Sequence, residues 1–355
     1  MTRKQTFNAI QIKAIDLVIA GHGATLAHSL AEQLGVSRAT ASRYVKKCVE
    51  SGRLKSTGGT RPVYELGPIR EIFRSYSLPG IDESIIWIKD FSPFFDLADN
   101  IRTVVEHGFT EMVNNANDHS EGGEVAIWMV CDETKVSIMI KDDGVGIFGK
   151  ITKALDLPDP RLSLLELAKG KFTTAPDAHS GEGIFFTSRM FDAFQILSDD
   201  LLFSHHADRK HDQLFDAELP ANIQSPGTTV LMELAVNSPT TTESIFKQYS
   251  TVPNEVGDNW FDRTVVPMKM AKIGDENLVS RSQAKRLVSR FGGFKSVVLD
   301  YAGIGMIGQA FADQVYRVFA NEHPGVALKT LNANEAVTQM VKQAMNARMK
   351  EIDAT

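Results

Sequence analysis

The feature that most constrains the fold is a pair of glycine-containing segments, one directly after a predicted strand and one at the start of a predicted helix. KDDGVGIF (residues 141–148) directly follows a β-rich run, and HSGEGIFFTSRM (residues 179–190) opens a helical stretch. Glycine lets the backbone approach a ligand closely, and the free amides at a helix N-terminus favour phosphate. These two junctions therefore predict a mixed strand and helix domain built around a ligand site.

The surrounding sequence supplies the strands and helices that such a domain needs. β-rich runs occupy residues 124–131, 135–142, 191–198 and 228–234. Stretches with helical spacing of apolar residues occupy residues 101–117, 163–169 and 184–190. This alternation predicts an α/β or α+β sandwich between about residues 80 and 236.

A third motif, FTEMVNNANDHS (residues 109–120), lies within the first of these helices. Glu111 and Asn115 are four residues apart, so both side chains lie on one face and can meet one ligand. In the 141–148 segment, Asp142 is the carboxylate that can read an amine on a bound base. A weaker fourth element, SPGTTVLMEL (residues 225–234), places Thr228 at the start of a strand.

In their order and spacing, these motifs resemble the nucleotide site of sensor histidine kinases, gyrase, MutL and the heat-shock chaperone ATPases, the GHKL superfamily. The resemblance implies a Bergerat-type α/β sandwich that binds ATP and Mg²⁺. It implies Asn115 as the magnesium ligand, Asp142 as the adenine reader, and Glu111 as a general base that polarises water. The remaining residues that it implies for ATP binding are Gly144 and Gly146 beside the base, Gly181 and Gly183 around the phosphates, and Thr228 at the adenine end.

The resemblance also implies a mobile lid over the phosphates between Phe148 and Ser180. This segment holds Lys169, Lys171, Thr173 and Thr174, and the alternative for its basic residues is plain surface.

Glu111 does not by itself distinguish hydrolysis from phosphoryl transfer to a protein. Protein kinases of the anti-sigma type carry a Glu at the same place, followed by Asn-Ala and His, here Asn115, Ala116 and His119. Histidine-kinase activity is not expected, because no dimerising helix with an acceptor histidine precedes the domain and His107 lies too close to the nucleotide helix.

Residues 1–68 predict a separate N-terminal domain. Apolar positions indicate helices over about residues 10–19 and 26–34, Ser37 is expected to cap a third, and β-formers flank a Gly-Gly turn at residues 58–59. This order resembles the winged helix-turn-helix of bacterial transcriptional regulators. Residues 67–80 are expected to be a connector, with residues 69–76 as a linking helix.

The charge distribution places any DNA contact in this N-terminal domain. The whole chain has a formal net charge of -6, yet basic residues outnumber acidic ones by more than two to one in residues 1–74. A helix beginning at Ser37 would present Arg38 to guanine edges and Ser42 or Arg43 to phosphates, with Lys55 and Arg61 gripping the backbone from the hairpin. Paired half-sites would imply a homodimer. The alternative is a domain that mediates protein contacts.

Residues 258–350 predict a smaller αβ domain, with a strand at 297–303, a helix at 310–320 and a terminal helix capped at Asn332 or Asn334. It resembles the STAS-like domains that partner anti-sigma kinases. Where phosphorylated STAS proteins carry a serine, this chain has Gly308 and Gln309, so we expect an interaction module and no self-phosphorylation there. The alternative is a small domain that only packs on its neighbour.

The fold class expected is therefore α+β multidomain, and the length of 355 residues agrees with several compact units. No apolar run is long enough to span a bilayer, which favours a cytoplasmic location, and Cys48 and Cys131 are expected to be reduced and buried. The leading hypothesis is a transcriptional regulator that binds ATP, hydrolyses it slowly and is switched by the nucleotide. The alternatives are a serine or threonine kinase of the anti-sigma type and a nucleotide-driven clamp or defence protein.

Overall fold

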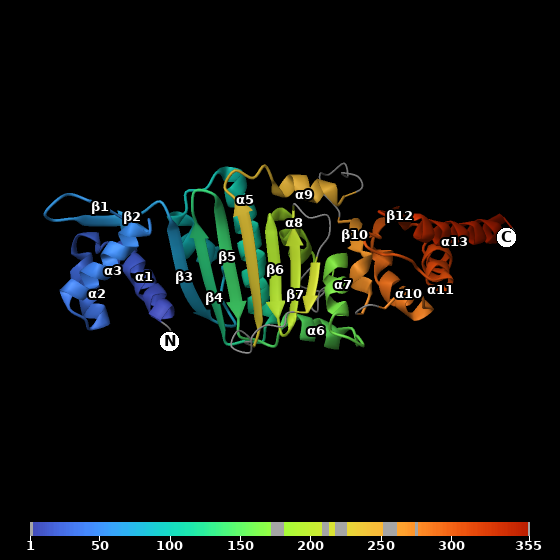
Figure 1. The fold of residues 1–355 in the computed structure, drawn as a ribbon, viewed down its shortest axis with the longest axis horizontal. Helices are drawn as coiled ribbons and strands as arrows, with labels where there is room; N and C mark the ends of the chain where they lie inside the picture. Colours follow the sequence, from blue (N-terminus) through green and yellow to red (C-terminus); the bar gives the residue numbers. More distant parts are fainter. Residues whose placement is uncertain are drawn as a thin grey trace.

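The computed structural model describes residues 3–171, 181–207, 213–216, 226–250, 261–273 and 276–353. Over this part of the chain the fold is mixed α/β, with sheets of two, three and seven strands. Figure 1 shows the N-terminal helices and hairpin at one end, the large sheet in the middle and the small sheet at the other end. The three parts therefore follow one another in space as they do in the sequence.

The N-terminal part contains three helices and a hairpin with its own hydrophobic core. Its elements are α1 (Arg3–Ile19), α2 (Leu26–Leu34), α3 (Arg38–Glu50) and the antiparallel strands β1 (Leu54–Thr57) and β2 (Val63–Leu66). The Ser37 hydroxyl accepts a hydrogen bond from the Thr40 amide at 3.2 Å, which confirms the predicted helix cap. Gly35 ends α2 with a φ of 62°, a conformation that favours glycine.

The middle part is a seven-stranded sheet in which every pair of neighbours runs antiparallel. Across the sheet the order is β3 (Arg70–Ser77), β4 (Glu124–Cys131), β5 (Lys135–Asp142), β9 (Thr228–Ala235), β6 (Ala193–Ser198), β7 (Leu201–His206) and β8 (Gln213–Asp216). The sequence predicted β4, β5, β6 and β9, and all are confirmed. It did not predict β7 and β8.

The expected linking helix over residues 69–76 is wrong, because residues Arg70–Ser77 form the edge strand β3. Ile72 lies opposite Met129 in the register with β4 and is buried. The short apolar run suits a helix or a strand equally well by local pattern. Pairing with β4, more than fifty residues away in the sequence, selects the strand.

Helices α5 (Asp99–His119) and α8 (Gly183–Met190) lie side by side behind the large sheet (Figure 1). Gly108 permits this close approach, since a Cβ there would lie 2.4 Å from the Phe191 ring. The other helices of this part are α4 (Glu83–Ile86), α6 (Ile147–Ala154), α7 (Leu162–Lys169) and α9 (Thr242–Gln248). The helices predicted within α5, α7 and α8 are confirmed.

The C-terminal part is a parallel sheet of β10 (Arg263–Pro267), β11 (Ser296–Asp300) and β12 (Ala327–Leu331) in that order. Its helices are α10 (Arg281–Val288), α11 (Gln309–Asp313), α12 (Ala320–Glu322) and α13 (Glu335–Asp353). The Asn334 side chain accepts from the Val337 amide at 2.9 Å, so Asn334 caps the last helix. Asn332 instead donates to the Asp300 carboxylate at 2.8 Å.

The parts of the molecule are joined in different ways. The N-terminal part meets the edge strand β3 through polar contacts, chiefly at Glu71, which accepts from Gln11 at 2.8 Å and from Arg53. Glu71 also accepts from Trp128 of β4 at 2.9 Å. By contrast, one continuous hydrophobic core runs from the large sheet into the C-terminal part. The ring centroids of Phe185 and Phe261, for example, lie 4.4 Å apart. The C-terminal part is therefore packed firmly on its neighbour.

Two smaller expectations can also be compared with the structure. Both cysteines are free, but only Cys48 is buried, while Cys131 is half-buried. Among the helices described, none combines the length and the apolar character needed to cross a membrane.

Candidate functional site

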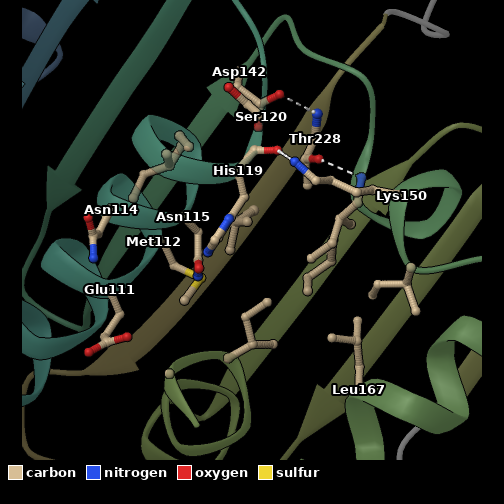
Figure 2. Close-up of a pocket in the computed structure, with 18 of the residues that line it drawn as sticks. Glu111, Met112, Asn114, Asn115, His119, Ser120, Asp142, Lys150, Leu167 and Thr228 are labelled. Atoms are coloured by element: carbon tan, nitrogen blue, oxygen red, sulfur yellow. Dashed lines mark hydrogen bonds between the residues drawn. The ribbon is translucent and has the colours of Figure 1, made fainter. Parts of the chain in front are cut away.

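A cavity of about 310 Å³ opens between α5, α7, α8 and the sheet, a size at the small end of typical ligand pockets. Figure 2 shows its lining side chains converging from the sheet and from several helices. The predicted residues that line it are Glu111, Asn115, Asp142, Gly146, Gly181, Gly183 and Thr228. Segments as distant in sequence as residues 111 and 228 therefore meet around one space.

Helix α5 supplies one wall through residues spaced four apart. Glu111, Asn115 and His119 follow one another along the helix and all line the cavity. The helix holds this orientation because its other face is buried at apolar positions such as Val105 and Phe109, and the Phe109 ring packs against Trp87 and Phe91. Burial of that stripe fixes the rotation of the helix and aims the polar residues at the cavity.

The carboxylate of Glu111 lies against the N-terminus of α8. A Cβ placed on Gly183 would stand 1.9 Å from Glu111 Oε2, so a side chain there would require this carboxylate to move. The helix N-terminus carries a partial positive charge and favours such an anionic neighbour. The Glu111 carboxylate therefore lies beside Gly183, one of the two glycines around which the sequence analysis expected the phosphates of a bound nucleotide.

Asp142 ends β5 with its side chain buried in the cavity wall. Its Oδ1 accepts from the Gly144 amide at 3.0 Å and from the Thr228 amide at 3.1 Å. Burial raises the pKa of Asp142, and the hydrogen bonds from the two amides oppose that rise. The two amides hold the carboxylate through Oδ1, and Asp142 lines the cavity.

Thr228 links the strand β9 to the helix that follows Asp142. Its hydroxyl oxygen accepts from the Ile147 amide at 3.1 Å, at the start of α6. Gly227 beside it has a φ of 94°, and a Cβ there would lie 2.1 Å from the Asp142 carbonyl oxygen. The backbones of two distant segments thereby touch directly beneath the Asp142 side chain.

The two glycines of the 141–148 segment have different roles. Gly144 does not line the cavity, but a Cβ there would lie 2.0 Å from the Ser120 carbonyl oxygen, so this glycine lets the loop pack on the end of α5. Gly146 lines the cavity with a φ of 80°, which favours glycine.

Sequence reasoning missed Lys150 and the apolar floor of the cavity. Lys150 lies one turn into α6 and donates from Nζ to the His119 carbonyl at 2.7 Å and to Glu121 at 2.9 Å. Ile140, Ile196 and Val230 line the cavity from the sheet. The period-two alternation of their strands was a signal for the floor, but only the tertiary structure shows which face is hollow.

The two lysines expected over the phosphates point elsewhere. Lys169 has a fully buried side chain that pairs with Glu166 at 2.6 Å. Lys171 donates to the Gly293 carbonyl at 3.0 Å and lies over the Phe294 ring. Both side chains contact the C-terminal part of the molecule, so the expectation is wrong for them. Thr173 and Thr174 lie outside the described residues.

The residues expected to contact DNA lie far from this cavity, on the N-terminal part. Arg38, Ser42 and Arg43 are exposed on α3, and Arg43 donates to the Thr40 hydroxyl at 3.2 Å. Lys55 is exposed on the hairpin but pairs with Glu65 at 2.9 Å, and Arg61 is exposed at its turn. These residues do not form a single enclosed site.

Metal binding by protein ligands alone is not supported in the part of the chain that the structure describes, since no cluster of three or more His, Cys, Asp or Glu side chains could hold an ion there. The cavity offers oxygen donors from Glu111 and Asn115. Such a pair suits Mg²⁺, which usually binds one or two protein ligands together with substrate phosphates.

Comparison with known proteins finds similarity to one family model and to several anti-sigma F factors. A family model described as a STAS-like domain of unknown function (DUF4325) matches residues 283–338. The anti-sigma F factor of Bacillus cytotoxicus is 27% identical over 115 residues, which cover 32% of this chain and 69% of that protein. The anti-sigma F factors of Bacillus thuringiensis and Bacillus mycoides are 25% identical over the same length. The chain thus carries a C-terminal STAS-like domain and has weak similarity to anti-sigma F factors over a third of its length.

Proposed function

We propose that the chain binds Mg²⁺-ATP in the central cavity, in a site of the GHKL type, and acts as a regulator of a protein partner, in the manner of an anti-sigma kinase. The observation that carries the proposal is the convergence of Glu111, Asn115 and Asp142 with the glycines at the start of α8 around one cavity. The similarity to anti-sigma F factors supports this alternative over the transcriptional regulator that the sequence first suggested.

Asp142 would hold the adenine end of the ligand. Its Oδ1 is already engaged by two backbone amides, so Oδ2 is the atom left to accept from the adenine amine. Ile140, Ile196 and Val230 give the neighbouring wall an apolar surface suited to the faces of a base. The site would therefore bind ATP in preference to GTP, because guanine has a carbonyl where adenine has the amine that donates a hydrogen bond to Asp142.

The phosphates would lie toward the N-terminus of α8, near Gly181 and Gly183. The carboxylate of Glu111 lies close to this helix start, and a phosphate beside it would be repelled without a cation. The side-chain oxygen of Asn115 would hold Mg²⁺ together with those phosphates, which leaves the Glu111 carboxylate able to accept a proton. The ion would supply charge neutralisation, and this requirement predicts magnesium-dependent binding.

Phosphoryl transfer would use Glu111 as the proton acceptor. The hydroxyl oxygen of an acceptor serine or threonine forms a bond to the γ-phosphorus, the bond from that phosphorus to the bridging oxygen breaks, and ADP leaves. The hydroxyl proton passes to the Glu111 carboxylate. If water replaces the hydroxyl, the same step is ATP hydrolysis.

The acceptor would belong to a partner protein and not to the STAS-like domain of this chain. Gly308 is the N-cap residue of α11, and a Cβ on Gly308 would lie 2.7 Å from the Cα of Val279. A serine at residue 308 therefore has no room, and Gln309 offers no hydroxyl. The STAS-like domain would serve as an interaction module.

A second candidate function, nucleotide-controlled DNA binding through a winged helix, is favoured by one specific observation. Helix α3 presents Arg38, Arg43 and Lys46 exposed along its length, behind a Ser37 cap. Such a helix suits the major groove. If the protein binds DNA and its DNA affinity changes with ATP at fixed salt, this second function is supported. If the protein does not bind DNA in any nucleotide state, the N-terminal part is better explained as a protein-binding domain.

The first experiment compares the wild type with Glu111→Ala and Asn115→Ala for ATP binding, phosphate release and transfer of γ-phosphate label to protein. We expect Asn115→Ala to lose magnesium-dependent binding, and Glu111→Ala to bind ATP but lose turnover. Glu106→Ala is the matched control, because Glu106 is an exposed carboxylate on the same helix and does not line the cavity.

The outcomes separate the alternatives. Label on a protein partner supports the kinase, and free phosphate alone supports an ATPase. Binding without turnover supports a nucleotide sensor. A wild type that does not bind ATP with magnesium present would overturn the proposal.

A further inference from the structure

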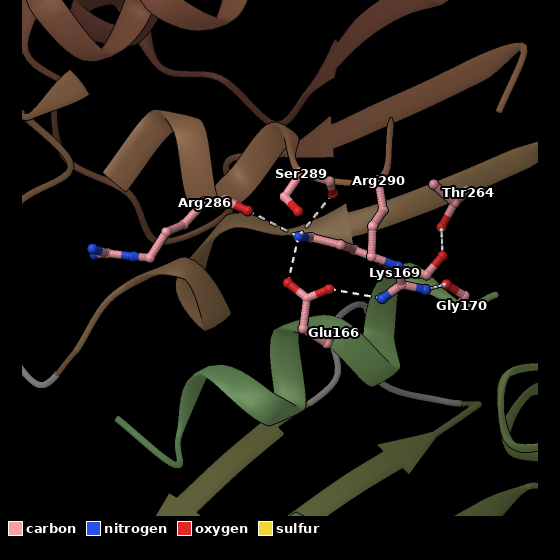
Figure 3. Close-up of polar contacts among 7 residues, drawn as sticks. All are labelled: Glu166, Lys169, Gly170, Thr264, Arg286, Ser289 and Arg290. Carbon is pink, nitrogen blue, oxygen red and sulfur yellow. Dashed lines mark hydrogen bonds and ion pairs between the residues drawn. The ribbon is translucent and has the colours of Figure 1, made fainter. Parts of the chain in front are cut away.

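Helix α7 faces the cavity on one side and the C-terminal part on the other. Leu167 and Gly170, at its end, line the cavity. Glu166 and Lys169, their neighbours in sequence, turn to the opposite side and contact α10 and the residues after it (Figure 3). The same short segment is therefore both a wall of the cavity and a contact surface of the STAS-like part.

The contact is a buried polar cluster, defined here as Glu166, Lys169 and Arg290. Lys169 Nζ donates to Glu166 Oε1 at 2.6 Å and to the carbonyl oxygens of Arg286 at 3.1 Å and Ser289 at 3.3 Å. Arg290 donates to Glu166 Oε2 at 2.7 Å and to the Gly170 carbonyl at 2.7 Å. The Arg290 guanidinium therefore binds both the Glu166 carboxylate and the backbone of Gly170, which lines the cavity.

The burial of this cluster makes its geometry specific. The side chains of Lys169 and Glu166 are 0% and 5% exposed. Buried charges are tolerated only when each is paired and hydrogen-bonded, so displacement of one member leaves another buried without a partner. The carbonyls that receive the Lys169 ammonium stand at the end of α10, where the helix dipole favours a cation. The end of α7 therefore has one strongly preferred position against the C-terminal part.

A separate aromatic contact connects the same two regions. Phe185 of α8 lines the cavity and packs on Phe261, which precedes β10, with ring centroids 4.4 Å apart. Phe261 in turn contacts Phe294 at 5.3 Å. The cavity thus contacts the C-terminal part through α8 as well as through α7.

We propose that Glu166, Lys169 and Arg290 are positioning residues through which the STAS-like part sets the nucleotide affinity of the cavity. The inference rests on the proposed ATP binding. It adds that the position of the STAS-like part against α7 and ATP binding in the cavity influence each other, because coupling between two sites is reciprocal. The cluster is the element that couples them.

The test measures the affinity of the full chain for Mg²⁺-ATP by calorimetry, together with thermal unfolding without nucleotide. Arg290→Ala removes the hydrogen bonds to Glu166 and to the Gly170 carbonyl. The double variant Glu166→Gln, Lys169→Met removes the charges of the buried pair while roughly keeping the shape of its side chains. We expect each to weaken ATP binding at least about fivefold, and Arg290→Lys to recover part of the loss. Arg281→Ala is the control, since Arg281 is an exposed arginine of α10. It should bind ATP as the wild type does.

A folded Arg290→Ala or double variant with wild-type ATP affinity would overturn the inference and leave the ATP site intact. Hydrogen exchange of the wild type is a second test that needs no variant. Saturating ATP is expected to slow exchange of the amides of residues 286–294, and unchanged exchange there would also overturn the inference. A wild type without ATP affinity would instead remove the proposed function itself, together with the coupling.

Discussion

The substitution Asp142→Asn tests the proposed adenine contact with little change in shape. Asparagine keeps an Oδ1 that can accept from the amides of Gly144 and Thr228, now at 3.0 Å and 3.1 Å. It replaces the other carboxylate oxygen with an NH₂ group, which cannot accept from an adenine amine. The variant therefore keeps the contacts within the protein and loses the contact expected with the ligand.

The size of the effect follows from the kind of hydrogen bond that is lost. A hydrogen bond to a charged group contributes about 1.5 to 3 kcal/mol, so we expect ATP affinity to fall about 10- to 150-fold. The free energy of unfolding should change by less than about 1 kcal/mol near neutral pH, because the charged form of Asp142 is already disfavoured by burial. Calorimetric titration with ATP and thermal unfolding measure the two quantities.

The raised pKa of Asp142 also predicts a pH dependence. Because the folded pKa lies above the unfolded value of about 3.9, the folded state binds this proton more tightly, and the contribution of Asp142 to stability falls as pH rises through that interval. An adenine amine stabilises the ionised form, so ATP affinity should fall as pH is lowered through the raised pKa. In Asp142→Asn this part of the pH dependence should disappear.

Asp143→Asn is the matched control. Asp143 is the exposed next residue, and its Oδ1 accepts from the amides of Gly123 and Glu124 away from the cavity. We expect it to bind ATP as the wild type does. Equal ATP affinity of Asp142→Asn and the wild type would refute the adenine contact, and an equal loss in both variants would show that the effect is not specific to Asp142.

Other substitutions test how the cavity and its surroundings are built. Gly144→Ala places a Cβ 2.0 Å from the Ser120 carbonyl oxygen and should lower the free energy of unfolding by about 1 to 3 kcal/mol, measured by denaturant unfolding, with a loss of ATP binding. Thr228→Val removes the acceptor of the Ile147 amide and should cost about 1 kcal/mol, whereas Thr228→Ser should retain wild-type stability. Glu71→Ala leaves buried donors without their acceptor and should destabilise the protein by about 3 kcal/mol, with earlier proteolysis of the N-terminal part; no change in either measurement would contradict this role for Glu71.

Local sequence patterns predicted much of the secondary structure and of the candidate site. The strands that contain Val125 and Ile138 alternate clearly, the Ser37 cap was evident, and the four-residue spacing of Glu111 and Asn115 placed both on one helix face. The failure at residues 69–76 has a physical cause, because an edge strand with a single buried side chain, Ile72, carries little alternation to recognise.

Lys169, at the end of α7, and Lys171, just after it, show the limit of such reasoning most clearly. Both belong to the segment that the resemblance implied to be a lid over the phosphates. Besides Glu166 and the Phe294 ring, their partners include the backbone carbonyls of Arg286, Ser289 and Gly293, and sequence patterns do not indicate which carbonyls a side chain will reach.

The sequence by itself determined the residue types that can meet a nucleotide, their order along the chain and the helices and strands that carry most of them. Those properties depend on spacing and backbone preference over a few residues, which a sequence displays directly. Only the tertiary structure decided that Thr228 touches Asp142, that Glu111 lies against Gly183, and that α7 is shared between the cavity and the STAS-like part. Such contacts join segments far apart in the chain, and they are set by how sheets and helices pack rather than by any local pattern.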